Sequence, residues 1–262
     1  MFRDIYLALH KYLGQHLLFE RRISLSGIKD VLLLDSTTVT LCLSLFLWAK
    51  YQQEKGAIKL HALLSLKTWL PLDIHVSDGK KPDNMGAYGV FPNKRNVIVA
   101  DRGYVDSELW YDWDSNGVTF VVRFKKDVTF RRIEERDQPE DGRRSQVIEL
   151  ITNNMEWDAG VVSKLYHARW EIDTFFKFIK QRLNITTFLG TSENAVRTQI
   201  WVAMIAALLL IYLKKLCGKN WTTSGLASSV RANLMSTYDL LAWLRRQYDV
   251  ADDSAKICLN SS

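Results

Sequence analysis

The hydrophobic positions of this chain follow two patterns, one of helical period and one of short apolar runs, and these divide the chain into predicted elements. Residues 2–20 carry apolar side chains mostly on one side of a helix. Residues 31–39 and 96–104 contain short apolar runs rich in β-branched side chains, a pattern typical of buried strands. Two further apolar segments, 57–66 and 69–78, are separated by two residues and predict a hairpin.

The second half of the chain alternates helical and strand-like segments. The predicted elements are a helix at 104–117, strands at 118–126 and 145–154, a helix from Asp158 to about Leu183, an apolar helix capped by Ser192 and Asn194, and a helical stretch near 236–248. The polar stretch 125–145 is either a solvated hairpin or a disordered loop, since its acids offset its bases. This order of elements predicts a mixed α/β sheet with helices packed on it.

Charge and composition change this picture little. A net charge of +6 and a pI of about 9.1 suit a polyanionic partner, but the excess is small for 262 residues. Three scattered cysteines without metal-ligand spacing fit a reducing cytoplasm. The N-terminus lacks the apolar core of a signal peptide, and the apolar run 200–213 is too short to span a bilayer. We therefore expect a soluble protein with no membrane partner.

Two aspartates come at chemically unusual places in the predicted strands. Asp35 and Asp101 each end an apolar run and are followed by small or turn-forming residues. A carboxylate there is costly unless it is paired, hydrogen-bonded or bound to a cation. For either residue alone, a capped turn or a salt bridge is an adequate explanation. Adjacent strand ends would instead bring both carboxylates to one rim of the sheet, where they could bind Mg²⁺.

A third carboxylate lies in the helix predicted after Asp158. At about 100° per residue, Asp173 shares one polar stripe with Tyr166, Arg169, Lys177 and Lys180, next to the apolar face, whereas Glu171 points to the far side. Ion pairs four residues apart are the simpler explanation for such a stripe. Three bases and a tyrosine around one acid are better suited to holding a phosphate beside a metal ligand.

Several blocks of the chain together resemble the bacterial insertion-sequence transposases of the DDE type, and more narrowly the family-four group with a Tyr-Arg-Glu-Lys signature. The blocks are DSTTVTLCLS, AIKLHALL, VADRGYVD, LYHARWEIDTFFKFIKQRLNI and GTSENAVRTQIW. The resemblance implies a ribonuclease-H-like catalytic domain at 28–215, with a β-rich insertion at about 118–152 before the last catalytic helix. A helical N-terminal remnant at 1–27 and a helical tail at 216–262 would flank it.

The resemblance also assigns roles to residues. Asp35, Asp101 and Asp173 match the three catalytic acids, which hold two Mg²⁺ ions that Mn²⁺ can replace. Tyr166, Arg169 and Lys180 match the family's Tyr, Arg and Lys, and Lys177 and Arg102 are further candidates to bind DNA phosphates. Asp173 stands where the family has Glu, which is a departure of one methylene group. Trp170 is a candidate either for stacking on a base or for packing, and His61 is more consistent with a structural role.

The implied function is cleavage of element ends and joining of the 3′-hydroxyl to target DNA by two-metal phosphoryl transfer. Its partner would be double-stranded DNA, bound by a homodimer in the bacterial cytoplasm and at the nucleoid. The first alternative is an N-terminally truncated, inactive remnant that binds DNA or a full-length partner. The second is a general ribonuclease-H-like nuclease, which shares the acids but leaves the Tyr, Arg and Lys unexplained.

Overall fold

A computed structural model describes residues 1–14, 26–41, 45–46, 48–52, 55–88, 92–124, 148–217, 221–237 and 239–246. The chain divides into two compact units. One comprises residues 19–176, and the other comprises residues 1–18 together with 177–262. Each unit is described by itself below.

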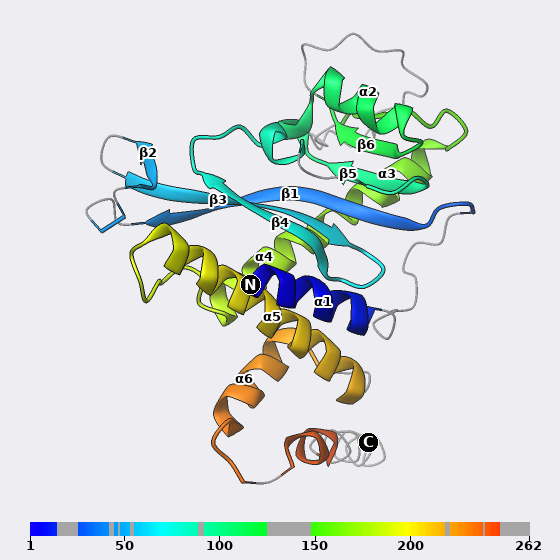
Figure 1. The fold of residues 1–262 in the computed structure, drawn as a ribbon. Helices are drawn as coiled ribbons and strands as arrows, with labels where there is room; N and C mark the ends of the chain where they lie inside the picture. Colours follow the sequence, from blue (N-terminus) through cyan, green and yellow to red (C-terminus); the bar gives the residue numbers. More distant parts are fainter. Residues whose placement is uncertain are drawn as a thin grey trace, which may run out of the picture. The chain divides into compact units, whose positions relative to one another are not determined.

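The first unit is built on one mixed sheet, which has seven strands in the part of the chain that the structure describes (Figure 1). The strands are β1 (Asp30–Leu41), β2 (Lys50–Gln52), β3 (Lys55–Ser65), β4 (Pro71–Asp78), β5 (Asn96–Ala100), β6 (Thr119–Arg123) and β7 (Leu150–Thr152). β1 pairs antiparallel with β3 and parallel with β5, β4 joins the far side of β3, and β6 is parallel to β5. Three antiparallel strands followed by two parallel strands form a ribonuclease-H-like sheet, which confirms the predicted fold class.

Helical segments pack on this sheet. They are η1 (Asn84–Gly86), η2 (Arg102–Tyr104), α2 (Ser107–Ser115), α3 (Ala159–His167) and α4 (Trp170–Arg182), of which α4 belongs to this unit as far as Phe176. One buried cluster joins the first face of the sheet to α2; its members include Leu32, Leu34, Ile98, Ala100, Tyr104, Leu109 and Trp113. Because side chains alternate along a strand, Leu33 and Asp35 point to the opposite face.

Three sequence-based boundaries were wrong. The hairpin connection covers residues 66–70 rather than two residues, and Trp69 within it has a φ of 56°. The strand predicted at 96–104 ends at Ala100 because η2 follows. The helix predicted from Asp158 to Leu183 is interrupted after His167, where the N–H groups of Arg169, Glu171 and Ile172 bond carbonyls three residues back. Such bonds tighten the chain locally into a 3₁₀-type turn.

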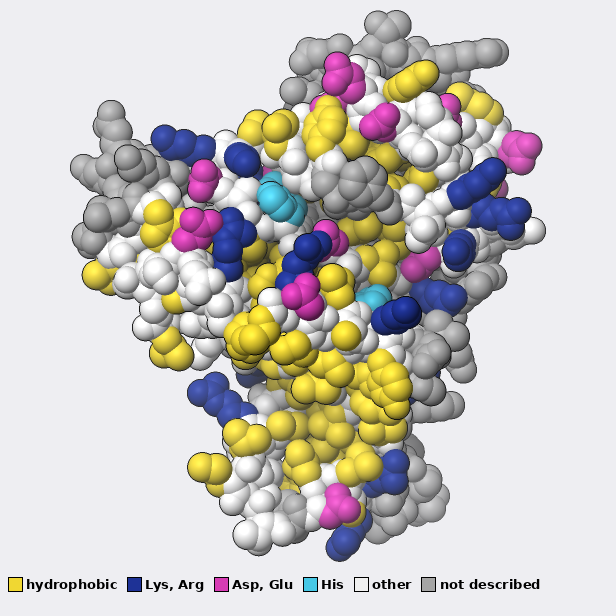
Figure 2. Space-filling model, in the orientation of Figure 1, with side chains coloured by type: hydrophobic (Ala, Val, Ile, Leu, Met, Phe, Trp, Pro, Cys, Tyr) yellow, Lys and Arg dark blue, Asp and Glu magenta, His cyan; other side chains and the backbone are white. Residues whose placement is uncertain are grey.

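The second unit contains α1 (Phe2–Gly14), α5 (Glu193–Cys217) and α6 (Thr223–Asn233), with α1 and α6 both in contact with α5. Ser192 Oγ accepts a hydrogen bond from the N–H of Ala195, as expected of a helix cap. The exposed hydrophobic side chains of α5 include Val202, Leu209 and Leu216. Figure 2 shows hydrophobic side chains gathered on the surface of the part that contains α5. Together with its buried residues, they make α5 apolar over most of its length.

The length argument from residues 200–213 was wrong, because α5 has 25 residues and is long and apolar enough to cross a membrane. This is a weak indication, since the core helix of a soluble protein passes the same test. Val196, Ile200, Met204, Leu208 and Ile211 form a buried stripe along α5, as a core helix requires.

Some predictions lie on residues outside the described ranges. They include the end of the first helix, at 15–20, all of the polar stretch 125–145, and the two last residues of the helical stretch near 236–248. The β-rich insertion is described only at its borders, by β6 and β7. The domain boundaries predicted from the sequence remain a prediction.

Candidate active site

Asp35 and Asp101 lie side by side because of the parallel pairing of β1 and β5. In that register Leu34 lies opposite Ala100, and the residue that follows each of them is an aspartate, Asp35 or Asp101. β5 ends at Ala100, and Asp101 continues with an extended backbone (φ −87°, ψ 175°) before η2 begins. Asp35 lies within β1, which continues to Leu41 in its pairing with β3. The adjacency expected from the two apolar runs is therefore present, although only one of the two strands ends there.

The turn between α3 and α4 supplies the side chains that contact these acids. Tyr166, in the last turn of α3, donates its hydroxyl to Asp101 Oδ1 at 3.1 Å. Arg169, in the turn itself, donates from Nη1 to Asp35 Oδ2 at 2.8 Å. The interruption of the predicted helix thus places a basic residue over the sheet. No Pro or Gly marks this turn in the sequence.

Arg169 lies between two of the three acids. Its Nη1 bonds Asp35, and its Nη2 is 3.6 Å from Asp173 Oδ2 on the first turn of α4. Its guanidinium carbon is 5.8 Å from the centre of the Tyr166 ring. The Arg169 side chain is 14% exposed and that of Asp35 17%, so their ion pair is shielded from water. The turn thus joins the third acid to the first through one guanidinium group.

The electrostatics of Asp35 are unusual for a carboxylate. Its pKa is raised to about 6, mainly by burial and also by the nearby charges of Asp173 and Asp101, against the effect of the Ser36 N–H and of Arg169. Burial also raises the pKa of the Tyr166 hydroxyl, as does the charge of Asp101. Negative charge is therefore incompletely compensated at Asp35, a condition under which a bound cation stabilises the ionised form.

The carboxylates have the chemistry that a magnesium site needs, since Mg²⁺ prefers hard oxygen ligands. Among the described residues, however, no three His, Cys, Asp or Glu side chains lie close enough together to hold one ion. Arg169 separates two of the acids, because its guanidinium lies between Asp35 and Asp173. The oxygen donors of these acids suit a divalent cation, and Asp35 and Asp173 would hold one together only with this guanidinium displaced.

The other predicted residues are placed as follows. Arg102 is exposed at the start of η2, directly after Asp101. Lys177 and Lys180 lie further along α4, in the second unit, so their proposed contact with phosphates remains a prediction. Glu171 lies away from the acids, where its Oε2 accepts a hydrogen bond from the Trp69 indole at 3.1 Å.

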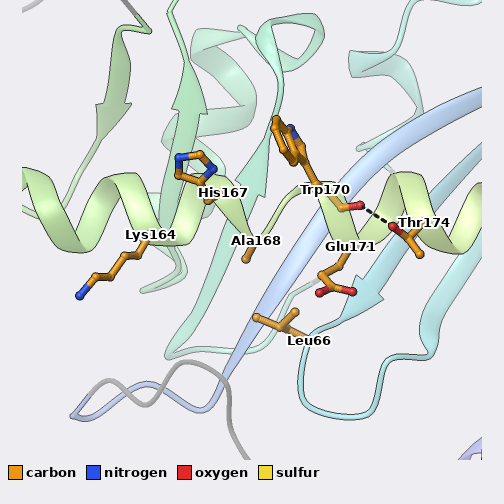
Figure 3. Close-up of a pocket in the computed structure, with 7 residues that line it drawn as sticks. All are labelled: Leu66, Lys164, His167, Ala168, Trp170, Glu171 and Thr174. Carbon is orange, nitrogen blue, oxygen red and sulfur yellow. Dashed lines mark hydrogen bonds between the residues drawn. The ribbon is translucent and has the colours of Figure 1, made fainter. Parts of the chain in front are cut away.

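A pocket of about 300 Å³ lies beside the α3–α4 turn (Figure 3). It is lined by Leu66, Lys164, His167, Ala168, Trp170, Glu171 and Thr174. Trp170 is 63% exposed, and its ring meets that of His167 edge to face at 5.8 Å between centres. An aromatic side chain this exposed contributes little to the core, and the stacking of Trp170 on a base remains a prediction.

Sequence reasoning missed one acid near the site. Asp83, in the segment before η1, accepts hydrogen bonds from Ser36 Oγ at 2.5 Å and from Lys59 Nζ at 3.0 Å. Its place in a stretch rich in Gly, Pro and Asn gave only a turn signal. Long-range contacts of this kind, 47 residues apart in the case of Ser36, leave no periodic pattern in the sequence.

The mixed sheet and a match to one family define the class of this protein. Residues 26–209 match the transposase DDE domain family, and the chain belongs to this family. The resemblance to insertion-sequence transposases of the DDE type is thereby confirmed, while the narrower family-four assignment remains a prediction.

The curated relatives carry transposase names. The chain is 29% identical over 225 residues to the probable transposase for insertion sequence element IS5377 of Geobacillus stearothermophilus, covering 74% of this chain and 59% of that protein. It is 28% identical over 224 residues to the putative transposase y4zB of Sinorhizobium fredii, covering 73% and 63%. It is 25% identical over 233 residues to the putative transposase for insertion sequence element IS4SA of Synechocystis, covering 80% and 66%. The chain thus spans about three-fifths to two-thirds of each relative's length.

A solved structure is also similar. The piggyBac transposase in a synaptic complex with hairpin DNA aligns with 84% of this chain and 57% of its own, at a TM-score of 0.49 and 11% identity.

Proposed function

We propose that this chain is the catalytic domain of a DNA transposase that cuts the ends of its element and joins the 3′-hydroxyl to target DNA. The observation that carries the proposal is the contact of the Tyr166–Arg169 turn with Asp35 and Asp101. Side chains of the block LYHARWEIDTFFKFIKQRLNI reach Asp35 and Asp101, which are 134 and 65 residues away in the chain. A structural ion pair explains one such contact but not a tyrosine and an arginine on adjacent acids.

Each residue of the cluster has a role in this proposal. Asp35, Asp101 and Asp173 would hold two Mg²⁺ or Mn²⁺ ions, which supply activation of the attacking oxygen and stabilisation of the leaving oxygen when bound. Arg169, displaced from between Asp35 and Asp173, would then bind a phosphate oxygen close to the cut, for which its planar donor group is suited. Tyr166 orients Asp101 through its hydroxyl, because the hydroxyl donates to Oδ1.

Groups around the cluster would hold the DNA. Arg102 is exposed beside Asp101 and can reach a backbone phosphate, as can Lys177 and Lys180 if α4 lies along the duplex. The exposed Trp170 would stack on a base next to the cleaved bond, with Lys164 near the same pocket for a phosphate. The substrate is double-stranded DNA bearing the element's ends, and a homodimer would bring two ends together.

Assays of cleavage and strand transfer, on DNA that carries the repeats at the ends of the element, test this proposal. We expect Mg²⁺- or Mn²⁺-dependent products from the chain and loss of at least about 10²-fold in rate in Asp35→Ala, since the cations lose a shared ligand. Asp78→Ala is a matched control, because Asp78 is an exposed acid at the end of β4. Cleavage that persists in Asp35→Ala would contradict the assignment of the metal site.

One observation favours a second candidate, a protein that binds DNA without cutting it. Asp173 has one methylene fewer than the family's Glu, is 44% exposed, and contacts Arg169 only at 3.6 Å. A carboxylate that fails to reach the other two acids leaves phosphate binding intact but removes the third metal ligand. DNA binding without cleavage, together with cleavage by Asp173→Glu, would identify this case.

A further inference from the structure

Asp83 lies behind the candidate active site, on the other face of the sheet. Ser36 follows Asp35 on β1 and shares the face of Leu32 and Leu34, which pack in the cluster with Tyr104 and α2. Asp83 contacts Ser36 on this face, whereas Asp35 points to the opposite face, towards Arg169. Asp83 is therefore linked to Asp35 through Ser36, but it lies on the face of the sheet opposite to Arg169.

Ser36 connects the two aspartates directly. Its N–H donates to Asp35 Oδ1 at 2.7 Å, and its hydroxyl donates to Asp83 Oδ1 at 2.5 Å. The same residue thus holds the Asp35 carboxylate on one face and is held by Asp83 on the other. Because Ser36 lies in the paired part of β1, opposite His61 on β3, its backbone has little freedom to move independently of this bond.

Asp83 is itself held in an ionised form. Burial raises its pKa, but the Ser36 hydroxyl and the Lys59 ammonium more than offset this, so that its pKa lies below the ordinary value. Lys59 Nζ bonds Asp83 Oδ1 at 3.0 Å and the carbonyl of Lys81 at 2.8 Å, which ties the segment before η1 to β3. The Lys59 side chain is only 14% exposed, so this ion pair is partly shielded from water.

The segment after Asp101 is shaped to the same carboxylate. A Cβ atom at Gly103 would lie 2.8 Å from Asp83 Oδ2, so only glycine at this position allows Asp83 its present place. At the start of η1, Asn84 donates to Asp106 Oδ2 at 2.8 Å, and Asp106 caps α2. The segment around Asp83 therefore contacts both the residue after Asp35 and the η2–α2 region that follows Asp101.

We propose that Asp83 is a positioning residue for the metal site, which acts on Asp35 through Ser36 and sets the place of Asp101 through the close approach to Gly103. The inference rests on the proposed function, because it requires that Asp35 binds a divalent cation. Outer residues that orient a metal ligand typically change metal affinity about 10- to 100-fold when they are removed. Asp83 itself does not coordinate the metal, since it contacts the opposite face of the sheet.

Titration calorimetry measures the binding of Mn²⁺ to the purified chain, and it tests this role without depending on cleavage. We expect Asp83→Ala and Ser36→Ala each to weaken Mn²⁺ binding about tenfold. The double variant should lose no more than either single variant, because both residues belong to one connection. Ser36→Thr keeps the hydroxyl and should bind as the unaltered chain does, and Asp78→Asn is the matched control for loss of an acid.

The outcomes separate this inference from the proposed function. Equal Mn²⁺ affinity in Ser36→Ala and Ser36→Thr would overturn the inference, because the hydroxyl would then have no role. Loss of affinity in Asp83→Ala but not in Ser36→Ala would also overturn it, since Asp83 would then act by another route. Unchanged Mn²⁺ binding in Asp35→Ala would contradict the proposed function itself. Thermal unfolding of each variant shows whether a loss of affinity reflects loss of the fold. The comparison of Mn²⁺ affinity between Ser36→Ala and Ser36→Thr tests the hydroxyl even if Asp83→Ala does not fold.

Discussion

Arg169 Nη1 lies 2.8 Å from Asp35 Oδ2, and the two residues are 134 positions apart in the sequence. This pair joins the α3–α4 turn to the strand at the centre of the sheet. Asp35 has a pKa of about 6, so the protein retains a carboxylate whose ionised form is destabilised by burial. Sites of this kind cost stability and are typical of functional centres, where a cation or a substrate group supplies the missing charge.

Replacing Arg169 should destabilise the protein more when the substitution leaves the carboxylate of Asp35 without a cationic partner. Arg169→Lys keeps the charge but cannot reach both Asp35 and Asp173 with a planar donor group, and we expect a loss of about 1–2 kcal/mol in the free energy of unfolding. Arg169→Ala leaves Asp35 without its partner and should lose about 3 kcal/mol. Urea unfolding measures both values. Arg102→Lys, at an exposed position, should change stability by less than about 0.5 kcal/mol, and an equal loss there would contradict the account.

Replacing Asp173 by the glutamate that the family-four resemblance implies should raise activity. Asp173→Glu adds one methylene and extends the carboxylate towards Asp35 and Asp101, and a displacement near 1 Å at a reacting centre is worth about 10²-fold in rate. We therefore expect faster Mn²⁺-dependent cleavage in Asp173→Glu than in the unaltered chain. Asp173→Asn keeps the length but removes the charge and should not cleave. A slower Asp173→Glu protein would show that the shorter side chain already suits its site.

Trp170 should matter for DNA and not for folding. Its side chain is 63% exposed, so Trp170→Ala should change the free energy of unfolding by less than about 0.5 kcal/mol. Stacking on one base is worth about 1–3 kcal/mol, and this should appear as weaker binding of end DNA. Fluorescence of 2-aminopurine at positions beside the cut reports the stacking. Tyr111→Ala, on α2 and 75% exposed, is the control, and equal effects of the two substitutions would argue against a specific base contact.

His61 should make the fold sensitive to acid. Its pKa is lowered to about 4, mainly by burial and also by the charge of His75. The unfolded chain takes up a proton at His61 below about pH 6.5, whereas the folded chain does so only near 4. The contribution of neutral His61 to stability is therefore fully present above pH 6.5 and is lost between 6.5 and 4, by up to about 3 kcal/mol.

Urea unfolding at pH 7.5 and pH 5 measures this effect. His61→Asn should show a smaller difference between the two values than the unaltered chain, and His167→Asn, at an exposed position, should show the same difference as the unaltered chain. An unchanged difference in His61→Asn would contradict the role of burial. The substitution is sterically demanding, because Gly86 packs against the His61 ring, so the comparison uses differences between pH values rather than absolute stabilities.

The sequence predicted the parts of the site that follow from periodic patterns. Apolar runs ending at Asp35 and Asp101 predicted buried strands, and parallel pairing of neighbouring strands is enough to bring their next residues together. Helical spacing separated Asp173 from Glu171, and Glu171 indeed bonds Trp69 away from the acids. These inferences needed only local repeats and the rules of strand pairing.

Other features depend on tertiary contacts and were not predictable in the same way. The tight turn at Ala168 and Arg169 interrupts a sequence with helical period and no Pro or Gly, so no local signal marks it. The role of Asp83 depends on Ser36, Lys59 and the missing side chain at Gly103, which come from three separate segments. One sequence without relatives aligned to it does not reveal such combinations.

The most direct test of the central claim is to change the ligand preference of the acids themselves. Cysteine thiolate is a softer ligand than carboxylate, so Asp35→Cys and Asp101→Cys should discriminate against Mg²⁺ more strongly than against Mn²⁺. The measurement is the cleavage rate on end DNA in each metal, in the unaltered chain and in the Asp173→Glu background, with Asp78→Cys as control. We predict that both variants lose cleavage in Mg²⁺ and regain part of it in Mn²⁺, while Asp78→Cys behaves as its parent in both. Equal rates in the two metals for Asp35→Cys and Asp101→Cys, at the level of the parent, would contradict a metal site at these residues.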